Sequence, residues 1–131
     1  MIGLDTNVLV RYIMQDDPKQ SRLATELVES LTADEPGFVP LVSMVELAWV
    51  LLSSFNLKRA QLVAAMKGLL QTKEIHVERA EVVWRAVRKF KDSPADFADC
   101  LIEQSATAAG CSQTMTFDRG AAKNCAMTLI L

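Results

Sequence analysis

Four acidic residues of this chain lie within, or at the border of, strongly apolar sequence, where a charged group is costly unless something compensates it. Asp5 follows the apolar run 2–4, and Asp118 follows the apolar run 115–117. Glu46 and Asp99 interrupt apolar segments with helical spacing. Carboxylates are the ligands that Mg²⁺ and Mn²⁺ prefer, so these acids together suggest a metal site. Such a site activates water and stabilises the charge of a phosphodiester under attack.

Three of these acids also have a purely structural interpretation. Asp5 can be the N-cap of a helix that begins at Thr6. Glu46 can complete a capping box with Ser43, three residues earlier. Asp118 can be a turn residue or an N-cap before the following helix or turn. The metal-site interpretation therefore depends on whether the acids meet at one place.

The position of Asp99 follows from helical geometry. Ser93-Pro94 is expected to start a helix that ends near Gly110 and whose apolar stripe contains Leu101 and Ile102. At about 100° per residue, Asp99 falls at the edge of this stripe and is half-inward. Asp96 lies farther toward solvent and is a first-turn helix acid or a second acid at the rim of the site.

Alternating strands and helices are expected along the chain. Asp17, Pro18 and Gln20 form a helix-start signature. Residues 75–77 alternate as a short strand, and residues 79–91 form an amphipathic helix. The remaining segments are a strand interrupted by Pro40, a buried helix over 43–52, a helix over 57–70, and strands over 112–117 and 128–131. This order is typical of a parallel sheet flanked by helices.

Length and charge limit the function further. The chain has 131 residues, which predicts a single domain over residues 1–131, and its formal net charge is −2. Nucleic acid would therefore be held by a local basic patch or through metal ions rather than by bulk positive charge. The candidates for such a patch are Arg11, Arg85, Arg88 and Lys89. For residues 85–89 the alternative is an ordinary solvated helix face.

The remaining inventory excludes several classes of protein. The only histidine is His76, which excludes a two-histidine ribonuclease mechanism. The sequence has no Ser/His/Asp set, zinc cluster or phosphate-binding glycine-rich loop. The three cysteines form no CxxC pair, which fits a reducing cytoplasm. We expect no membrane span and no signal peptide.

The motifs around these acids resemble those of PIN domains, and most closely the VapC-type toxins of bacterial toxin–antitoxin systems. The motifs are Leu4-Asp5-Thr6-Asn7-Val8-Leu9, Ser43-Met44-Val45-Glu46-Leu47, Asp96-Phe97-Ala98-Asp99-Cys100-Leu101-Ile102 and Thr116-Phe117-Asp118. The resemblance covers the whole chain. It departs from the family pattern at Cys100 and Glu103-Gln104, where relatives more often have small apolar residues. These positions do not affect the acids.

The resemblance implies a three-layer α/β/α sandwich with a central, mainly parallel sheet, and a Mg²⁺- or Mn²⁺-dependent endoribonuclease that acts through metal-activated water. Asp5, Asp99 and Asp118 would hold the metal, with Glu46 as a further ligand or as the group that polarises the attacking water. Asn7 and Thr116 would support them. The resemblance also implies a homodimer, RNA as substrate, and a cognate antitoxin through which DNA is contacted only indirectly.

Two other functions stay open on the residues themselves. An aspartyl phosphotransfer or phosphatase domain would use Asp5 as nucleophile, but Thr6-Asn7 follows it where a second acid is wanted. A non-catalytic α/β interaction module would use the acids only as helix caps.

Overall fold

The computed structural model describes all residues, 1–131, and the chain divides into two compact units, residues 1–78 and 79–131. In the first unit, strands β1 (Ile2–Gly3), β2 (Gly37–Val39) and β3 (Ile75–Val77) form a parallel sheet in the order β1-β2-β3. Gly37 of the middle strand pairs with Ile2 on one side and Ile75 on the other. Helices connect the strands, as parallel pairing requires.

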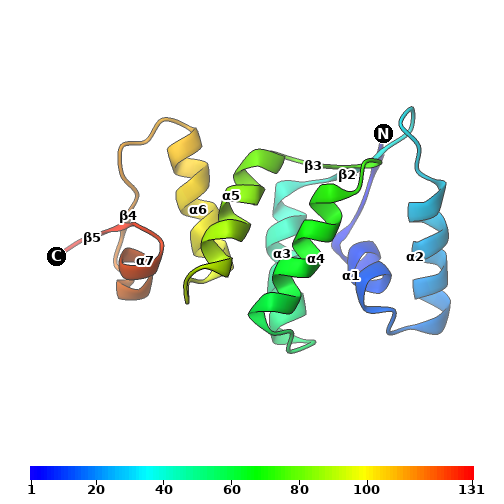
Figure 1. Ribbon diagram of the computed structural model, residues 1–131, viewed down its shortest axis with the longest axis horizontal. Coiled ribbons are helices and arrows are strands. Elements are labelled where there is room, and N and C mark those ends of the chain that lie inside the picture. The colour runs from blue at the N-terminus through cyan, green and yellow to red at the C-terminus, as the bar shows by residue number, and fades with distance from the viewer. The chain divides into compact units, whose positions relative to one another are not determined.

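Four helices accompany this sheet, and they are visible in blue to green in Figure 1. They are α1 (Thr6–Met14), α2 (Pro18–Ser30), α3 (Leu41–Ser53) and α4 (Arg59–Gln71). The fully buried Leu9, Leu47, Leu51 and Leu62 come from α1, α3 and α4. The predicted start of α2 is confirmed, because the Asp17 side chain accepts hydrogen bonds from the backbone of the first turn and Pro18 follows it.

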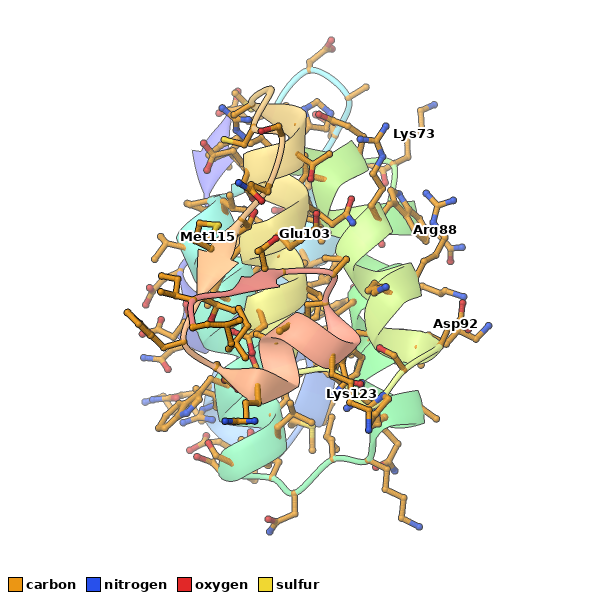
Figure 2. All side chains as sticks on the ribbon, turned by 90° about the vertical axis from the view of Figure 1, so that its left-hand side faces the viewer. Lys73, Arg88, Asp92, Glu103, Met115 and Lys123 are labelled. Atoms are coloured by element: carbon orange, nitrogen blue, oxygen red, sulfur yellow. The ribbon has the colours of Figure 1, made fainter.

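The second unit contains three helices and a short parallel strand pair. Its elements are α5 (Ala80–Lys91), α6 (Phe97–Ala108), β4 (Met115–Thr116), α7 (Arg119–Asn124) and β5 (Thr128–Leu129). Helices α5 and α6 pack together, and the rings of Phe90 and Phe97 meet edge to face with centroids 5.8 Å apart. Figure 2 looks onto this unit.

The strand predicted to continue past Pro40 is wrong. Pro40 is the N-cap of α3, and its carbonyl accepts the backbone N–H of Ser43. The Leu41 N–H is satisfied by the Glu78 carboxylate at 2.7 Å. The predicted capping box is therefore wrong too, because Ser43 lies inside the helix. Nor is α3 buried all round, since Trp49 is 68% exposed.

Two predictions in the second unit also need correction. The helix expected from Ser93 begins at Phe97, because Asp96 is its N-cap, and Ile102 is 54% exposed rather than in the core. The strand expected over 112–117 is limited to β4. The predicted α/β class with parallel strands is confirmed, while the single domain stays a prediction. No helix has both the length and the apolar character needed to cross a membrane.

Candidate functional site

Asp5 lies between the end of β1 and the start of α1, and its carboxylate makes no hydrogen bond that stabilises the fold. It occupies the N-cap position with extended backbone angles, φ −76° and ψ 155°, yet its side chain accepts no capping hydrogen bond. Asp17 does the opposite at the start of α2, where its Oδ1 accepts from the Gln20 N–H at 2.8 Å. The interpretation of Asp5 as a side-chain cap is therefore wrong, and its exposed carboxylate is free for chemistry.

Glu46 is the second acid of this unit. It projects from the middle of α3 into solvent and has no hydrogen bond or ion pair to the protein. With the capping box excluded, no structural role explains a carboxylate in the most apolar helix of the chain. Its neighbours Leu47 and Ala48 are buried, so α3 holds the backbone of Glu46 firmly.

The acids of the second unit are placed by helix caps. Asp96 caps α6, its Oδ1 accepting the Asp99 N–H at 3.0 Å. Asp118 caps α7, its Oδ1 accepting the Gly120 N–H at 2.8 Å. The Thr116 hydroxyl in turn accepts the Asp118 N–H at 3.0 Å, which is a supporting contact. Each cap uses Oδ1 only, so Oδ2 of both aspartates has no protein partner.

Asp99 lies in the first turn of α6 and is half-buried, as its position on the helix predicted. Burial raises the pKa of this carboxyl, and the negative charges of Asp96 and Asp118 raise it further. A neighbouring acid has this effect only when it is close. In the second unit the charges of Asp96 and Asp118 therefore both act on Asp99, and none of the three carboxylates has an ion pair.

The chemistry of these donors fits a hard divalent cation, since the free atoms are carboxylate oxygens. Within either unit, however, no group of three or more Asp, Glu, His or Cys side chains surrounds a common metal position. The structure brings Asp96 and Asp118 into electrostatic range of Asp99. That Asp5 and Glu46 join them stays a prediction, as does the metal-ligand role of each acid.

The candidate RNA-contacting cations differ in their surroundings. Arg11 is half-buried and fixed by two acceptors, Gln20 Oε1 at 2.9 Å and Asp16 Oδ2 at 3.0 Å. Arg85 and Arg88 are exposed on α5, and Figure 2 shows Arg88 extending away from the helix. Lys89 is half-buried beside them.

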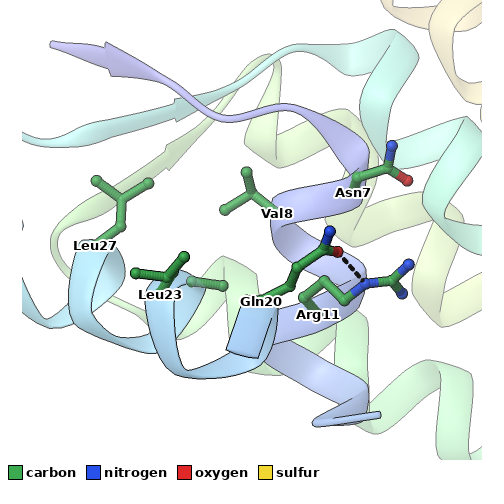
Figure 3. Close-up of a pocket in the computed structure, with 7 residues that line it drawn as sticks. Asn7, Val8, Arg11, Gln20, Leu23 and Leu27 are labelled. Atoms are coloured by element: carbon green, nitrogen blue, oxygen red, sulfur yellow. Dashed lines mark hydrogen bonds between the residues drawn. The ribbon is translucent and has the colours of Figure 1, made fainter. Parts of the chain in front are cut away.

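A pocket of about 240 Å³ lies between α1 and α2, and Figure 3 shows it. Val8 of α1 and Leu23, Ala24 and Leu27 of α2 form its apolar wall. Asn7, Arg11 and Gln20 supply its polar groups. The sequence predicts only a helix-start role for Gln20. The role in the pocket has no local signal, because the contact of Gln20 with Arg11 joins two different helices.

Comparison with known proteins now places the chain. It is similar to a VapC ribonuclease of Aquifex aeolicus (strain VF5), with 23% identity over 116 residues that cover 88% of this chain and 86% of that protein. The PIN domain family matches residues 2–126. That match includes all the acids discussed above and extends over most of both units. The chain therefore belongs to the PIN domain family.

Proposed function

We propose that this chain is a Mg²⁺- or Mn²⁺-dependent endoribonuclease that acts as the toxin of a toxin–antitoxin pair. Membership of the PIN domain family and the similarity to a VapC ribonuclease support a nuclease toxin. The observation that supports metal dependence is the placement of Asp99, where burial raises the pKa of its carboxyl and the nearby charges of Asp96 and Asp118 raise it further, with no protein cation paired to any of the three. Crowding of this kind is expected where an absent cation normally compensates the charge.

In this proposal Asp5, Glu46, Asp99 and Asp118 hold the metal. A bound divalent cation supplies an activated water and stabilises the charge that develops on the phosphodiester. Asp5 and Glu46 contribute carboxylates that no cap or ion pair occupies. Asp118 contributes Oδ2 while its Oδ1 keeps α7 capped.

The supporting roles follow from the contacts already given. Thr116 holds the backbone of Asp118 and so fixes the direction of that carboxylate. Asp96 is an additional acid whose charge acts on Asp99. Asn7 lies two residues beyond Asp5, in the first turn of α1, and its exposed side chain is proposed to support the site.

Arg85, Arg88 and Lys89 are proposed to steer the RNA backbone, against the alternative that they are an ordinary solvated face. Replacing all three by Ala should weaken RNA binding and flatten its salt dependence, because each lost phosphate contact lowers the salt slope by about one. Unchanged affinity and slope would remove this role.

The proposal extends to the surroundings of the protein. We place the chain in the cytoplasm as a single domain over residues 1–131 that forms a homodimer. Its partners are the RNA substrate and a cognate antitoxin that holds it inactive, and DNA is reached only through that antitoxin.

The testing experiment is cleavage of total cellular RNA by purified, antitoxin-free protein, with Mg²⁺ or Mn²⁺ compared with EDTA. Asp5→Asn and Asp99→Asn should abolish the discrete products. Asp34→Asn is the matched control, because Asp34 is an exposed aspartate in a turn without hydrogen bonds or ion pairs. The melting temperature should rise when Mn²⁺ is added, since a ligand at about 100 times its Kd stabilises the native state by about 2.7 kcal/mol.

Two outcomes would contradict the proposal. If the protein cleaves no RNA and its melting temperature does not change with metal, a non-catalytic interaction module whose acids only cap helices would be favoured. A phosphoryl group trapped on Asp5 would favour an aspartyl phosphotransfer or phosphatase domain.

A further inference from the structure

Two buried cysteines are in contact within the second unit. Cys100 lies near the start of α6, and Cys125 is the C-cap residue of α7. Their Sγ atoms are 3.8 Å apart, and the two residues are 0% and 1% exposed. Both carry thiols. Because 25 positions separate them in the sequence, only the fold brings this pair together.

The pair is joined through the backbone to two of the proposed metal ligands. Cys100 directly follows Asp99 in α6. Cys125 ends α7, the short orange-red helix of Figure 1, and Asp118 is the N-cap at the other end of that helix. A bond between the two sulfurs would therefore tie together the segments that carry Asp99 and Asp118.

We propose that Cys100 and Cys125 form a reversible disulfide in the presence of a peroxide, and that this bond weakens the metal site of Asp99 and Asp118. The inference deepens the proposed function, because it takes these acids to be metal ligands. The two sulfurs of a disulfide are about 2.05 Å apart, so they must approach by about 1.8 Å from their present 3.8 Å. Side chains in a packed core have little free space, so the backbone beside Asp99 and the end of α7 move with the sulfurs.

The oxidation balances with one molecule of hydrogen peroxide. One sulfur attacks a peroxide oxygen, an S–O bond forms as the O–O bond breaks, and water leaves; the product is a sulfenic acid. The second sulfur attacks the first, the S–S bond forms as the S–O bond breaks, and the leaving hydroxide takes up the second thiol proton as water. Two thiols and one peroxide thus give one disulfide and two waters. A dithiol reductant reverses the change by thiol–disulfide exchange.

Local opening of α7 gives the peroxide access to the pair. In the folded state burial raises the pKa of the Cys125 thiol, which keeps it protonated and poorly reactive. Helix α7 has six residues, too few to be stable alone, and the Asp118 side chain caps it. When α7 opens, Cys125 leaves the core while Cys100 stays in the longer α6. Cys125 is therefore the thiol that meets the peroxide, and Cys100 is the thiol that closes the bond.

Simple packing is the alternative explanation of this contact, because buried cysteines behave as small apolar residues. Packing alone predicts that the two thiols survive a peroxide. It also predicts that opening of α7 has no effect on their oxidation.

The first test follows bond formation by mass spectrometry in Cys111→Ser, which removes the exposed third thiol. Hydrogen peroxide should remove the mass of two hydrogen atoms from the monomer, and dithiothreitol should restore it. Asp118→Ala in this background should speed the reaction about fivefold, the change in helix opening expected from the loss of one N-cap. Asp17→Ala is the matched control, because Asp17 caps α2 in the first unit and should leave the rate unchanged.

The second test compares the reduced and oxidised forms of Cys111→Ser. The oxidised form should bind Mn²⁺ about tenfold more weakly, measured by the metal-induced rise in melting temperature. It should also cleave RNA about ten- to a hundredfold more slowly, since displacing a catalytic group by about 1 Å can cost about a hundredfold. Peroxide should change neither property in Cys125→Ala, which keeps the core apolar and cannot form the bond.

The outcomes separate this inference from the proposed function. If no disulfide forms in peroxide, even in Asp118→Ala, the contact is simple packing and the inference is wrong, while the nuclease stands. A disulfide that leaves both Mn²⁺ binding and cleavage unchanged would overturn it as well. A disulfide that weakens Mn²⁺ binding, in a chain that cuts no RNA even when reduced, would support the inference and contradict the nuclease.

Discussion

Of the five glycines, Gly37 is the one whose added Cβ meets the shortest contacts, so we expect Gly37→Ala to destabilise the fold. It begins β2, the middle strand of the first sheet, and a Cβ built there lies 2.8 Å from Leu4 Cδ1 and 2.9 Å from Leu31 Cδ1. Carbon atoms in contact prefer about 3.5–4.0 Å. Both leucines are buried, at 2% and 6% exposure, so their side chains can move only by displacing their neighbours.

The expected cost of Gly37→Ala follows from this overlap. Overpacking of a core costs about 1–3 kcal/mol. The loss of unfolded-state entropy on replacing glycine returns about 0.4–1 kcal/mol. At the midpoints of these two ranges, the net loss in the free energy of unfolding is about 1.3 kcal/mol. With an unfolding entropy of about 2 cal/mol/K per residue, this lowers the Tm by roughly 5 °C.

The assay is thermal and urea unfolding of metal-free protein, with Gly68→Ala as the control. Gly68 lies within α4, and its added Cβ has no atom within 4 Å. Alanine there should raise stability by about 0.5–1 kcal/mol, because glycine is a poor helix former. A Gly37→Ala protein that melts at or above the wild type would refute the reasoning. Since Leu4 precedes Asp5, the variant should also lose cleavage activity.

Three further predictions concern the acids and their surroundings. Because the pKa of Asp99 is raised, the metal-free folded state loses stability as pH rises from the ordinary value of 3.8 through the raised value. Asp99→Asn should therefore have a higher melting temperature than the wild type at pH 7 and the same melting temperature below pH 3.8. Equal melting temperatures of the two proteins at both pH values would contradict this prediction. Asp118→Ala should lower the free energy of unfolding by about 1 kcal/mol because it removes the cap of α7, whereas Asp118→Asn keeps an acceptor there. Asp5→Ala should lower it by less than about 0.5 kcal/mol, although all three variants should lose cleavage activity. Equal urea midpoints for the two Asp118 variants would contradict the capping role. Thr6→Val should melt at or above wild type, because the Thr6 hydroxyl is buried without a hydrogen-bond partner, and a loss above about 1 kcal/mol would reveal an unseen partner.

The sequence predicted elements whose signals are local. Asp17 and Pro18 begin α2 as expected, and the apolar pattern of residues 79–91 predicted α5 almost to the residue. The start of α3 could not be predicted, because its first N–H is satisfied by Glu78, which lies 37 positions away in the sequence. The same limit applies to the contact of Gln20 with Arg11.

The local placement of two candidate acids could be predicted in a similar way. The half-buried position of Asp99 follows from helical spacing, and the cap formed by Asp118 was an open alternative that the structure confirms. What no spacing rule could decide is that Asp5 occupies an N-cap position without using its carboxylate. That outcome depends on the path of the backbone after β1.

Because Asp118 caps a helix with its side chain and Asp5 does not, inactivating substitutions at these two positions should differ in how much folded protein they leave in the cell. If the chain is a toxin, cells that escape it carry inactivating substitutions. A change at Asp5 or Glu46 removes no structural contact, so it leaves a folded, inert copy that still occupies antitoxin and dimer partners. A change of Asp118 to a residue without an acceptor also uncaps α7, so more of that copy unfolds and is cleared. Escape mutants at Asp5 should therefore persist as abundant, dominant-negative protein, whereas those at Asp118 should be scarce in the cell.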